Sequence, residues 1–397
     1  MVYYLLIALL VILANADFDR HKSTLLVDKS SNYRMSFQTC IVVLILVASF
    51  RAYNIGLDTM TYKFVYYNNA NGIGHTGFEL FFDLLFNICN ALSLDYSVVI
   101  SIFSIVCYTL AANYIYKNSI NPVFSLLLFV TLGIYAQTLN IMRQALAIIV
   151  CLYSVKYIKT GEFIKFIGVI FIALLCHATA LIFIPAYFVR YFKLNKYTIS
   201  FAVLFTCAMS ILLPIISKFI SGFTTVDYYG RYFEDTYYQN EVSLLAILFT
   251  LGLFAIFIIM YANRDKLNNA QGDNKFNIFL KLYFISTLLR IFALFTPAPE
   301  VIGRLALFYF IYCIFLIPYF IEFGLVGKKN IWTNLVIFAS LIYYVALIEV
   351  KKSCGITPYA FIWDRDVILT ILFYVIFAVL SVIAIRLIGL RYKEERL

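Results

Sequence analysis

A run of apolar sequence near the middle of the chain contains polar side chains that could bind or react with a substrate. The sequence YAQTLNIMRQALA, residues 135–147, places four of them at helical spacing: Gln137, Asn140, Arg143 and Gln144. We therefore expect these four side chains on one face of a helix. An arginine at the centre of a membrane helix costs on the order of 3 kcal/mol, so it usually faces a protein interior or a water-filled cavity, where it binds something. Alternatively, Arg143 extends to the membrane interface and the amides only bridge neighbouring helices.

Four arginines stand in or beside apolar runs, where their charge needs a counterpart: Arg51, Arg143, Arg290 and Arg304. Guanidinium groups suit phosphate oxygens because they donate hydrogen bonds in a planar fork. The set therefore predicts a shared phosphate site, with Arg143 and Arg290 as its main members. The alternative is that each arginine pairs separately with lipid headgroups or with an acidic side chain such as Asp58, Glu79 or Glu300.

Asp58, Glu79 and His177 are the candidates for a general base that deprotonates a hydroxyl. Asp58 follows a glycine in a turn-like segment, where a capping role is the alternative. His177 stands in an apolar run, either as a site residue or as a buried histidine bonded to a neighbouring carbonyl. The eight cysteines form no CxxC pair and the three histidines are scattered, so we expect no metal site. The sequence also has no Walker A loop and no Gly-rich dinucleotide fingerprint, and we expect no cofactor.

The elements that must position these residues are membrane helices. The chain has 397 residues, of which 63% are hydrophobic and 13% charged, and its mean hydropathy is +0.90. A soluble domain this apolar would have too little polar surface to stay dissolved. We therefore expect an all-α polytopic integral membrane protein. The net charge of +10 fits an excess of lysine and arginine on the cytoplasmic side, and nucleic-acid binding is not needed to explain it.

A helix needs roughly 20 apolar residues to cross a bilayer. The candidate spans are 1–16, 35–50, 96–116, 122–138, 140–157, 197–220, 243–262, 276–296, 304–323, 331–349 and 366–388. Because no soluble domain interrupts them, we expect a single transmembrane domain over residues 1–397. It should contain about 11 full spans, or about 12 to 13 if two doubtful runs also cross.

The two doubtful runs are 77–92 and 163–189. The first carries four polar residues on one face, as an interfacial helix would: Glu79, Asp83, Asn87 and Asn90. The second is long and contains His177 and Pro185, so we expect it to be re-entrant or broken. If neither run crosses fully, every basic loop falls on the cytoplasmic side. The outer face then receives Gln137, Asn140 and Arg143, and the loops near 51–76, 221–242, 297–303 and 350–365.

Several short motifs follow one another along the chain: R-x-x-N-x-G-x-D-x-x-x-Y from Arg51 to Tyr62, then Glu79, then Q-x-x-N-x-x-R-Q-A from Gln137 to Ala145, then A-x-x-x-H-x-[ST]-A from Ala173 to Ala180. Their order resembles the EpsG family of Wzy-like polymerases of bacterial exopolysaccharide, capsule and O-antigen. The resemblance is closest between Arg51 and Ala180 and continues more loosely through Arg304 and the Pro358-Tyr359 pair to the end.

This resemblance implies a multi-span glycosyltransferase of the GT-C type that works without a metal in the bacterial inner (plasma) membrane. Such an enzyme polymerises oligosaccharide repeat units linked to undecaprenyl diphosphate at the outer face of that membrane. Its partners would be the lipid-linked glycan donor and acceptor, membrane lipid, and a chain-length regulator and a flippase of the same pathway.

The resemblance and the residue chemistry together suggest a division of roles. The arginines Arg51, Arg143, Arg290 and Arg304 would hold the diphosphate, since a guanidinium can stabilise the charge on a departing lipid diphosphate. The base would be Asp58, Glu79 or His177. The side chains that orient sugars would be Tyr62, Gln137 and Asn140.

Other membrane functions remain as alternatives. A flippase or exporter of lipid-linked oligosaccharide would also need a cationic cavity, but with charges spread through the depth of the bilayer. An O-antigen ligase would share the lipid-diphosphate donor, and the sequence hardly separates it from a polymerase. A membrane O-acyltransferase should have an Arg/His pair near a cytoplasmic donor site, and no such pair stands on that side. A purely structural subunit would leave Arg143 and Arg290 without a purpose.

Overall fold

The computed structural model describes residues 31–71, 77–221, 244–269, 275–296, 299–325 and 327–363, together with Val375. The expected spans 1–16 and 366–388 lie outside these residues, apart from Val375, as does the expected loop 221–242 apart from its first residue. The described chain forms two compact units. The first unit comprises Met1–Tyr153, Phe171–Ala178 and Leu325–Leu397, and the second comprises Ser154–Ile170 and Thr179–Gly324.

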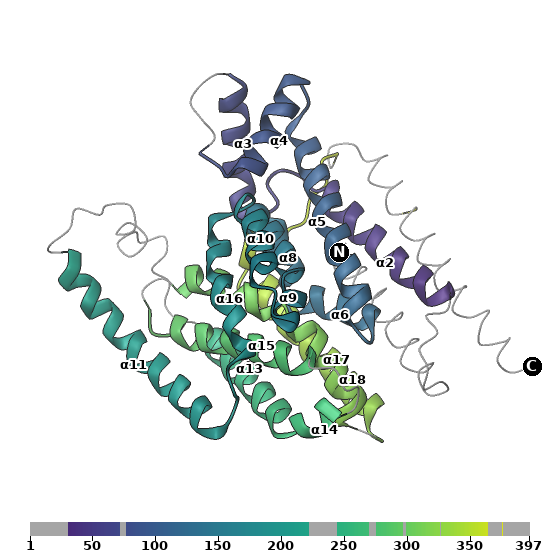
Figure 1. Ribbon diagram of the computed structural model, residues 1–397. Coiled ribbons are helices and arrows are strands. Elements are labelled where there is room, and N and C mark those ends of the chain that lie inside the picture. The colour runs from purple at the N-terminus through teal and green to yellow at the C-terminus, as the bar shows by residue number, and fades with distance from the viewer. Residues whose placement is uncertain are drawn as a thin grey trace, which may run out of the picture. The chain divides into compact units, whose positions relative to one another are not determined.

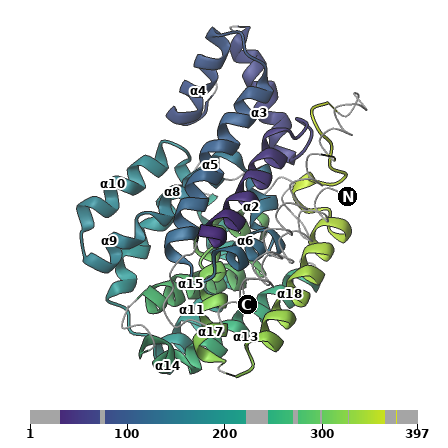
Figure 2. The ribbon, with the colours of Figure 1, turned by 90° about the vertical axis from the view of Figure 1, so that its right-hand side faces the viewer.

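Nearly all of the regular structure in the described residues is helical (Figures 1 and 2). The helices that begin before residue 178 are α2 Ser31–Ser49, α3 Leu57–Ala70, α4 Leu80–Ala91, α5 Tyr96–Asn118, α6 Pro122–Thr131, α7 Ile134–Asn140, α8 Met142–Leu152, α9 Val155–Thr160 and α10 Phe163–Leu174. Those that follow are the 3-10 helix η1 Ala178–Arg190, α11 Lys196–Ser221, α13 Leu244–Ala262, α14 Arg264–Asn269, α15 Lys275–Ala293, α16 Pro299–Phe310, α17 Cys313–Gly324, α18 Lys329–Val345, the π-helix η2 Ala346–Val350 and the 3-10 helix η3 Ser353–Gly355.

The expectation of a polytopic helical membrane protein is confirmed. Four helical segments of the described chain are long and apolar enough to cross a membrane: α5, α13, α15 and the continuous pair of α18 and η2. Two bent pairs bring the number to six if each is one span: α6 with α7, bent by 60°, and α16 with α17, bent by 48°. Because these numbers cover only the described residues, the expected total of about 11 to 13 spans remains a prediction.

The spacing predicted that the polar motif between residues 135 and 147 lies on one continuous helix. The structure shows instead that the helix is broken within the motif. Helix α7 ends at Asn140, Ile141 adopts a non-helical ψ of 55°, and α8 begins at Met142. The carbonyl of Leu139, which a continuous helix would pair with residue 143, instead accepts from Arg51 Nη2 and Thr59 Oγ1, both at 3.3 Å. Donors from another segment therefore replace the helical hydrogen bond at this break.

The expected outer loop 51–76 contains helix α3, and its first turn packs against the break between α7 and α8. The side chain of Asn140 accepts a hydrogen bond from the backbone amide of Asp58 at 2.8 Å and so satisfies one of the free donors at the start of α3. Gly56, the residue before the helix, has φ +97°, and a Cβ there would lie 2.9 Å from the Leu139 carbonyl oxygen. Close backbone approach and a positive φ both require glycine at this position.

A Gly56→Ala substitution should therefore destabilise the protein by about 1–3 kcal/mol through strain and loss of the contact with α7. The measurement is the thermal unfolding midpoint of purified protein in detergent. Gly252→Ala is the matched control, because Gly252 is helical and a Cβ there would have no other atom within 4 Å. A Gly56→Ala midpoint no lower than that of the control would contradict the close approach.

Helix α4 is short and pairs with α3 rather than standing alone. Its 12 residues rise only about 18 Å, less than the hydrocarbon core of about 30 Å. In both ribbon views α3 and α4 lie side by side (Figures 1 and 2). Asn69 donates to Asn87 at 2.8 Å, and the Asn90 amide donates to the Tyr66 carbonyl at 3.4 Å. Two of the polar residues expected on an interfacial face therefore bind the neighbouring helix.

The second unit is built around α15, which contacts α11, α13 and α16. Phe284 of α15 stacks on Phe257 of α13 with ring centroids 4.5 Å apart. Lys281, also on α15, is buried and donates to the Val189 carbonyl at 2.9 Å, near the end of the 3-10 helix η1. A cation is favourable there because the carbonyls at the end of a helix carry partial negative charge.

Candidate functional site

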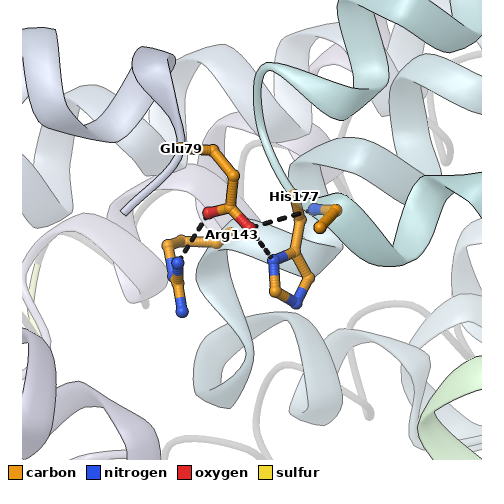
Figure 3. Close-up of polar contacts among 4 residues, drawn as sticks. Glu79, Arg143 and His177 are labelled. Atoms are coloured by element: carbon orange, nitrogen blue, oxygen red, sulfur yellow. Dashed lines mark hydrogen bonds and ion pairs between the residues drawn. The ribbon is translucent and has the colours of Figure 1, made fainter. Parts of the chain in front are cut away.

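Three of the residues selected from the sequence form a hydrogen-bonded cluster in the first unit, and Glu79 stands at its centre (Figure 3). Glu79 precedes the first residue of α4 and has an extended backbone. Its Oε2 accepts from Arg143 Nη1 at 2.6 Å. Its Oε1 faces Nδ1 of His177 at 2.6 Å and accepts from the backbone amide of Ala178 at 2.9 Å. We refer to Glu79, Arg143 and His177 as the charged triad.

His177 is available for this cluster because the helical run 163–189 is interrupted there. Helix α10 ends at Leu174, the 3-10 helix η1 begins at Ala178, and His177 lies between them. The start of α4 satisfies backbone groups freed by this interruption. The Phe81 amide donates to the Leu175 carbonyl at 2.9 Å, and the Ala178 amide donates to Glu79. These hydrogen bonds therefore fix the position of the Glu79 carboxylate relative to the interrupted segment that carries His177.

Arg143, in the first turn of α8 beyond the break at Ile141, is held by aromatic faces as well as by Glu79. Its guanidinium carbon lies 3.9 Å from the ring centroid of Phe78 and 5.5 Å from that of Tyr62. The rings of Phe78 and Tyr62 meet edge to face at 5.5 Å. Such cation–π contacts add to an ion pair and restrict the orientation of the guanidinium plane. Tyr62, expected to orient a sugar, thus lies beside Arg143.

The triad is partly exposed. The side chains of Arg143, Glu79 and His177 are 18%, 19% and 22% exposed. Burial opposes ionisation of the carboxylate, but hydrogen bonds from His177 and the Ala178 amide, together with the charge of Arg143, outweigh it and lower the pKa of Glu79 to about 2. Glu79 is therefore an anion at neutral pH and a weak base.

The ionised carboxylate fixes the tautomer of His177. A carboxylate can only accept hydrogen bonds, so Nδ1 of His177 must carry the proton that lies between them. In a neutral imidazole the other nitrogen, Nε2, is then the acceptor. Within the described part of the chain Nε2 makes no hydrogen bond. In Figure 3 the imidazole and the guanidinium flank the Glu79 carboxylate. The arrangement thus offers a proton acceptor next to a cation.

The low pKa of Glu79 predicts a specific dependence of stability on pH. A carboxylate whose pKa falls from 4.5 to about 2 on folding stabilises the fold fully above pH 4.5 and loses that stabilisation as pH falls toward 2. The contribution is at most about 3 kcal/mol, since one pKa unit corresponds to about 1.4 kcal/mol. Thermal unfolding of wild type and Glu79→Gln should therefore differ most at about pH 6 and above, and the difference should disappear only as the pH approaches 2. A gap that does not change with pH would contradict the assigned shift.

Three other residues selected from the sequence lie on or beside the segments that support the triad. Asn140 is buried, and its side chain caps α3 through the Asp58 amide. Asp58 itself is in the first turn of α3, where a negative side chain suits the helix N-terminus. Gln137 is on α7 and is half-buried. The contact between the Asn140 side chain and the Asp58 amide ties α3 to the break that precedes Arg143. The predicted sugar contacts of Gln137 and Asn140 remain predictions.

Arg51 is placed quite differently from Arg143. It is only 1% exposed, and its guanidinium donates to the carbonyls of Ala48 and Leu139 at 2.7 and 3.3 Å and to Ser104 Oγ at 3.4 Å. The backbone of Arg51 also forms a bridge with Phe361. These contacts join α2, α5 and α7, so they explain the burial of this arginine without a substrate.

Arg290 and Arg304 belong to the second unit. The guanidinium of Arg290 on α15 lies 4.8 Å from the ring centroid of Phe249 and 4.9 Å from that of Phe310. Arg304 is half-buried on α16. That either residue binds diphosphate remains a prediction.

Two members of the site were not selected from the sequence: Phe78 and the backbone amide of Ala178. Phe78 stands directly before Glu79 in an apolar segment, where its only signal is that adjacency. A backbone amide has no signal in a sequence at all. No group of three or more His, Cys, Asp or Glu residues that could hold a metal ion is found within the described ranges.

Comparison with known protein families identifies a match. The sequence model of the EpsG family matches residues 35–361, which contain all the members of the charged triad. No curated protein and no solved structure matches this chain.

Proposed function

The chain belongs to the EpsG family, and on that premise we propose that it polymerises oligosaccharide repeat units carried on undecaprenyl diphosphate into a surface polysaccharide. The family places the protein among polymerase-like membrane glycosyltransferases of exopolysaccharide synthesis. The observation that carries the finer proposal is the charged triad, in which an acceptor nitrogen of His177 lies beside a cation that suits phosphate.

The proposed step is a displacement at the anomeric carbon of the donor glycan. A hydroxyl of the acceptor repeat unit forms the new C–O bond, and its proton passes to Nε2 of His177. The bond from the anomeric carbon to the diphosphate oxygen breaks, and undecaprenyl diphosphate leaves with that electron pair. The imidazolium later returns its proton to solvent. The products are therefore the acceptor lipid, which now carries the longer glycan, and free undecaprenyl diphosphate. Together with the released proton they account for all the atoms of the two lipid-linked substrates.

In this proposal Glu79 orients the base instead of acting as the base. A general base works best when its pKa is near the operating pH, and the pKa of Glu79 at about 2 is far below it. Its hydrogen bond to Nδ1 directs Nε2 of His177 toward the hydroxyl and stabilises the imidazolium once it forms. Asp58 remains the alternative base, and mutation of Asp58 and of His177 in turn can show which of the two acts.

Arg143 supplies the positive charge for the leaving diphosphate. Glu79 occupies only one of its terminal nitrogens, Nη1, and among the described residues no hydrogen bond from Nη2 is found. The N–H groups of Nη2 can therefore donate to phosphate oxygens, whose charge rises as the bond breaks. Because the guanidinium supplies this charge, we propose that the reaction needs no metal.

The proposed setting is the outer face of a bacterial inner membrane, with the multi-pass chain acting as a GT-C-like enzyme. The carrier lipid would bring both substrates to the site within the bilayer, and a flippase and a chain-length regulator of the same pathway are the proposed partners. The finding that supports this setting is the set of long apolar helices in the described chain.

The test is turnover by purified protein in lipid vesicles with undecaprenyl-diphosphate-linked repeat units and a metal chelator. Wild type should produce a ladder of glycans of increasing length on the carrier lipid. Movement of intact lipid-linked units between leaflets without a ladder would make the protein a flippase. Transfer of glycan only when a lipid A core is added would make it a ligase. Either result would overturn the proposal.

A further inference from the structure

The apolar run between residues 163 and 190 doubles back on itself, and the ring contacts that pair its two halves lie in the second unit. Three pairs of aromatic rings join α10 to the 3-10 helix η1: Phe163 with Tyr187 at 4.9 Å, Phe166 with Tyr187 at 5.3 Å, and Phe166 with Phe183 at 6.4 Å. The partners move toward higher numbers on η1 as they move toward lower numbers on α10, so the two helices run antiparallel. The ends of this run therefore lie together.

Polar contacts also join the start of α10 to the end of η1. Tyr187 Oη donates to the carbonyl of Gly161 at 2.7 Å, and Arg190 Nη1 donates to Tyr187 Oη at 3.1 Å. The guanidinium of Arg190 also lies against Gly161, because a Cβ on that residue would be 2.1 Å from Nη1. Gly161 has φ +84° and ends α9. The turn before α10 and the last turn of η1 are thus one packed structure.

Neither helix is long enough to cross a bilayer by itself. The 12 residues of α10 rise about 18 Å, and the 13 residues of η1 rise about 26 Å in 3-10 geometry. The hydrocarbon core is about 30 Å thick. Two short antiparallel helices joined at their far end fit a hairpin that begins and ends at the same membrane face.

The end of the hairpin away from its turn, where the run begins and finishes, is strongly basic. Between residues 154 and 196 the chain has one carboxylate, Glu162, which pairs with Lys165. Against it stand six cations, of which all but the half-buried Arg190 are exposed: Lys156, Lys159, Lys165, Arg190, Lys193 and Lys196. We refer to these six as the basic end. Exposed aromatic side chains accompany them, with Tyr191 at 67% and Tyr197 at 73% exposure.

We infer that the basic end is a binding surface for the headgroups of anionic phospholipids at a single face of the membrane. The charge is complementary to such headgroups, and clusters of lysine and arginine beside membrane segments bind them. Exposed tyrosines beside the cations suit the boundary between headgroups and hydrocarbon, where aromatic rings gather. The apolar helices that follow, with Ile164 86% exposed, place this surface at a bilayer rather than in water. The inference does not depend on the proposed reaction.

The hairpin is tested by labelling single cysteines in intact cells with a membrane-impermeant maleimide. Lys156→Cys and Lys193→Cys are made in a Cys207→Ser background, because every other cysteine of the described chain is buried. A permeant maleimide establishes that each new thiol reacts. A hairpin predicts that both positions are reached from the same side. Labelling of one from outside and the other only after permeabilisation means that the run crosses the membrane, and the inference fails.

The lipid is tested by the binding of fluorescent phosphatidylglycerol to the full chain in neutral detergent. The variant Lys156→Gln/Lys193→Gln/Lys196→Gln should bind at least about tenfold more weakly than wild type, since each surface cation is worth about fivefold in affinity. Lys351→Gln/Lys352→Gln is the matched control, because both lysines are exposed and lie in the first unit. Equal binding by the two variants, or equally tight binding of phosphatidylcholine by wild type, would overturn the inference. Because neither assay uses a glycan substrate, failure here leaves the proposed polymerisation untouched.

Discussion

The His177→Ala variant is expected to fold normally and to polymerise at about 10²–10⁴-fold lower rate than wild type, the usual contribution of a general base. Its side chain is partly exposed, and among the described residues it makes one hydrogen bond, to Glu79, so its loss should cost little stability. The measurement is the initial rate of ladder formation at saturating lipid-linked substrate. The loss should fall on kcat, because the base acts in the transition state.

Two companion variants separate the role of His177 from that of the carboxylates. Glu79→Gln keeps an oxygen that can accept from Nδ1 and from the Ala178 amide, so it should leave a slow enzyme rather than an inactive one. Asp58→Asn should keep most of the activity, because the contact that ties this residue to the break is made by its backbone amide. If Asp58→Asn abolished the ladder while His177→Ala retained it, Asp58 would be the base and the assignment of His177 would be wrong.

The sequence was sufficient to select the members of the triad but not to join them. Each is a charged or polar residue in or beside apolar sequence, and such residues are costly enough to stand out. Their contacts link residues 64 and 98 positions apart. Those contacts depend on two interruptions of helices, at Ile141 and at His177. From its length, His177 and Pro185, we expected the run 163–189 to be re-entrant or broken. Helical spacing assumes that a helix continues, so it did not predict the interruption at Ile141.

The energetic cost of a charged residue in apolar sequence does not by itself distinguish a structural arginine from a functional one. Arg51 and Arg143 had the same signal in the sequence, because both place a guanidinium in an apolar chain. In the structure Arg51 is 1% exposed and bound to protein oxygens, and we propose that it holds α2, α5 and α7 together. The difference arises from the packing of segments far apart in the chain, which no local pattern records.

The Arg143→Ala variant is expected to lose polymerisation by at least about 10²-fold, as removal of one group that stabilises developing charge commonly does. It should also lose stability, because the Glu79 carboxylate would lose its cation while remaining partly buried. We expect a cost of about 1–3 kcal/mol, less than for a fully buried pair because both side chains are partly exposed. Arg143→Lys should recover most of the stability but only part of the rate, since an ammonium lacks the planar fork. The measurements are ladder formation and thermal unfolding on the same preparations.

The double variant Glu79→Gln/Arg143→Ala decides what Arg143 does beyond pairing with Glu79. If its only role is to neutralise the carboxylate, removing that charge makes the arginine dispensable, and the double variant should match Glu79→Gln in both stability and rate. If Arg143 also holds the leaving diphosphate, stability should recover toward that of Glu79→Gln while the rate stays lower by at least about tenfold. Recovery of both would leave Arg143 as a structural partner of Glu79. Full activity of Arg143→Ala alone would remove it from the reaction and return it to the membrane interface.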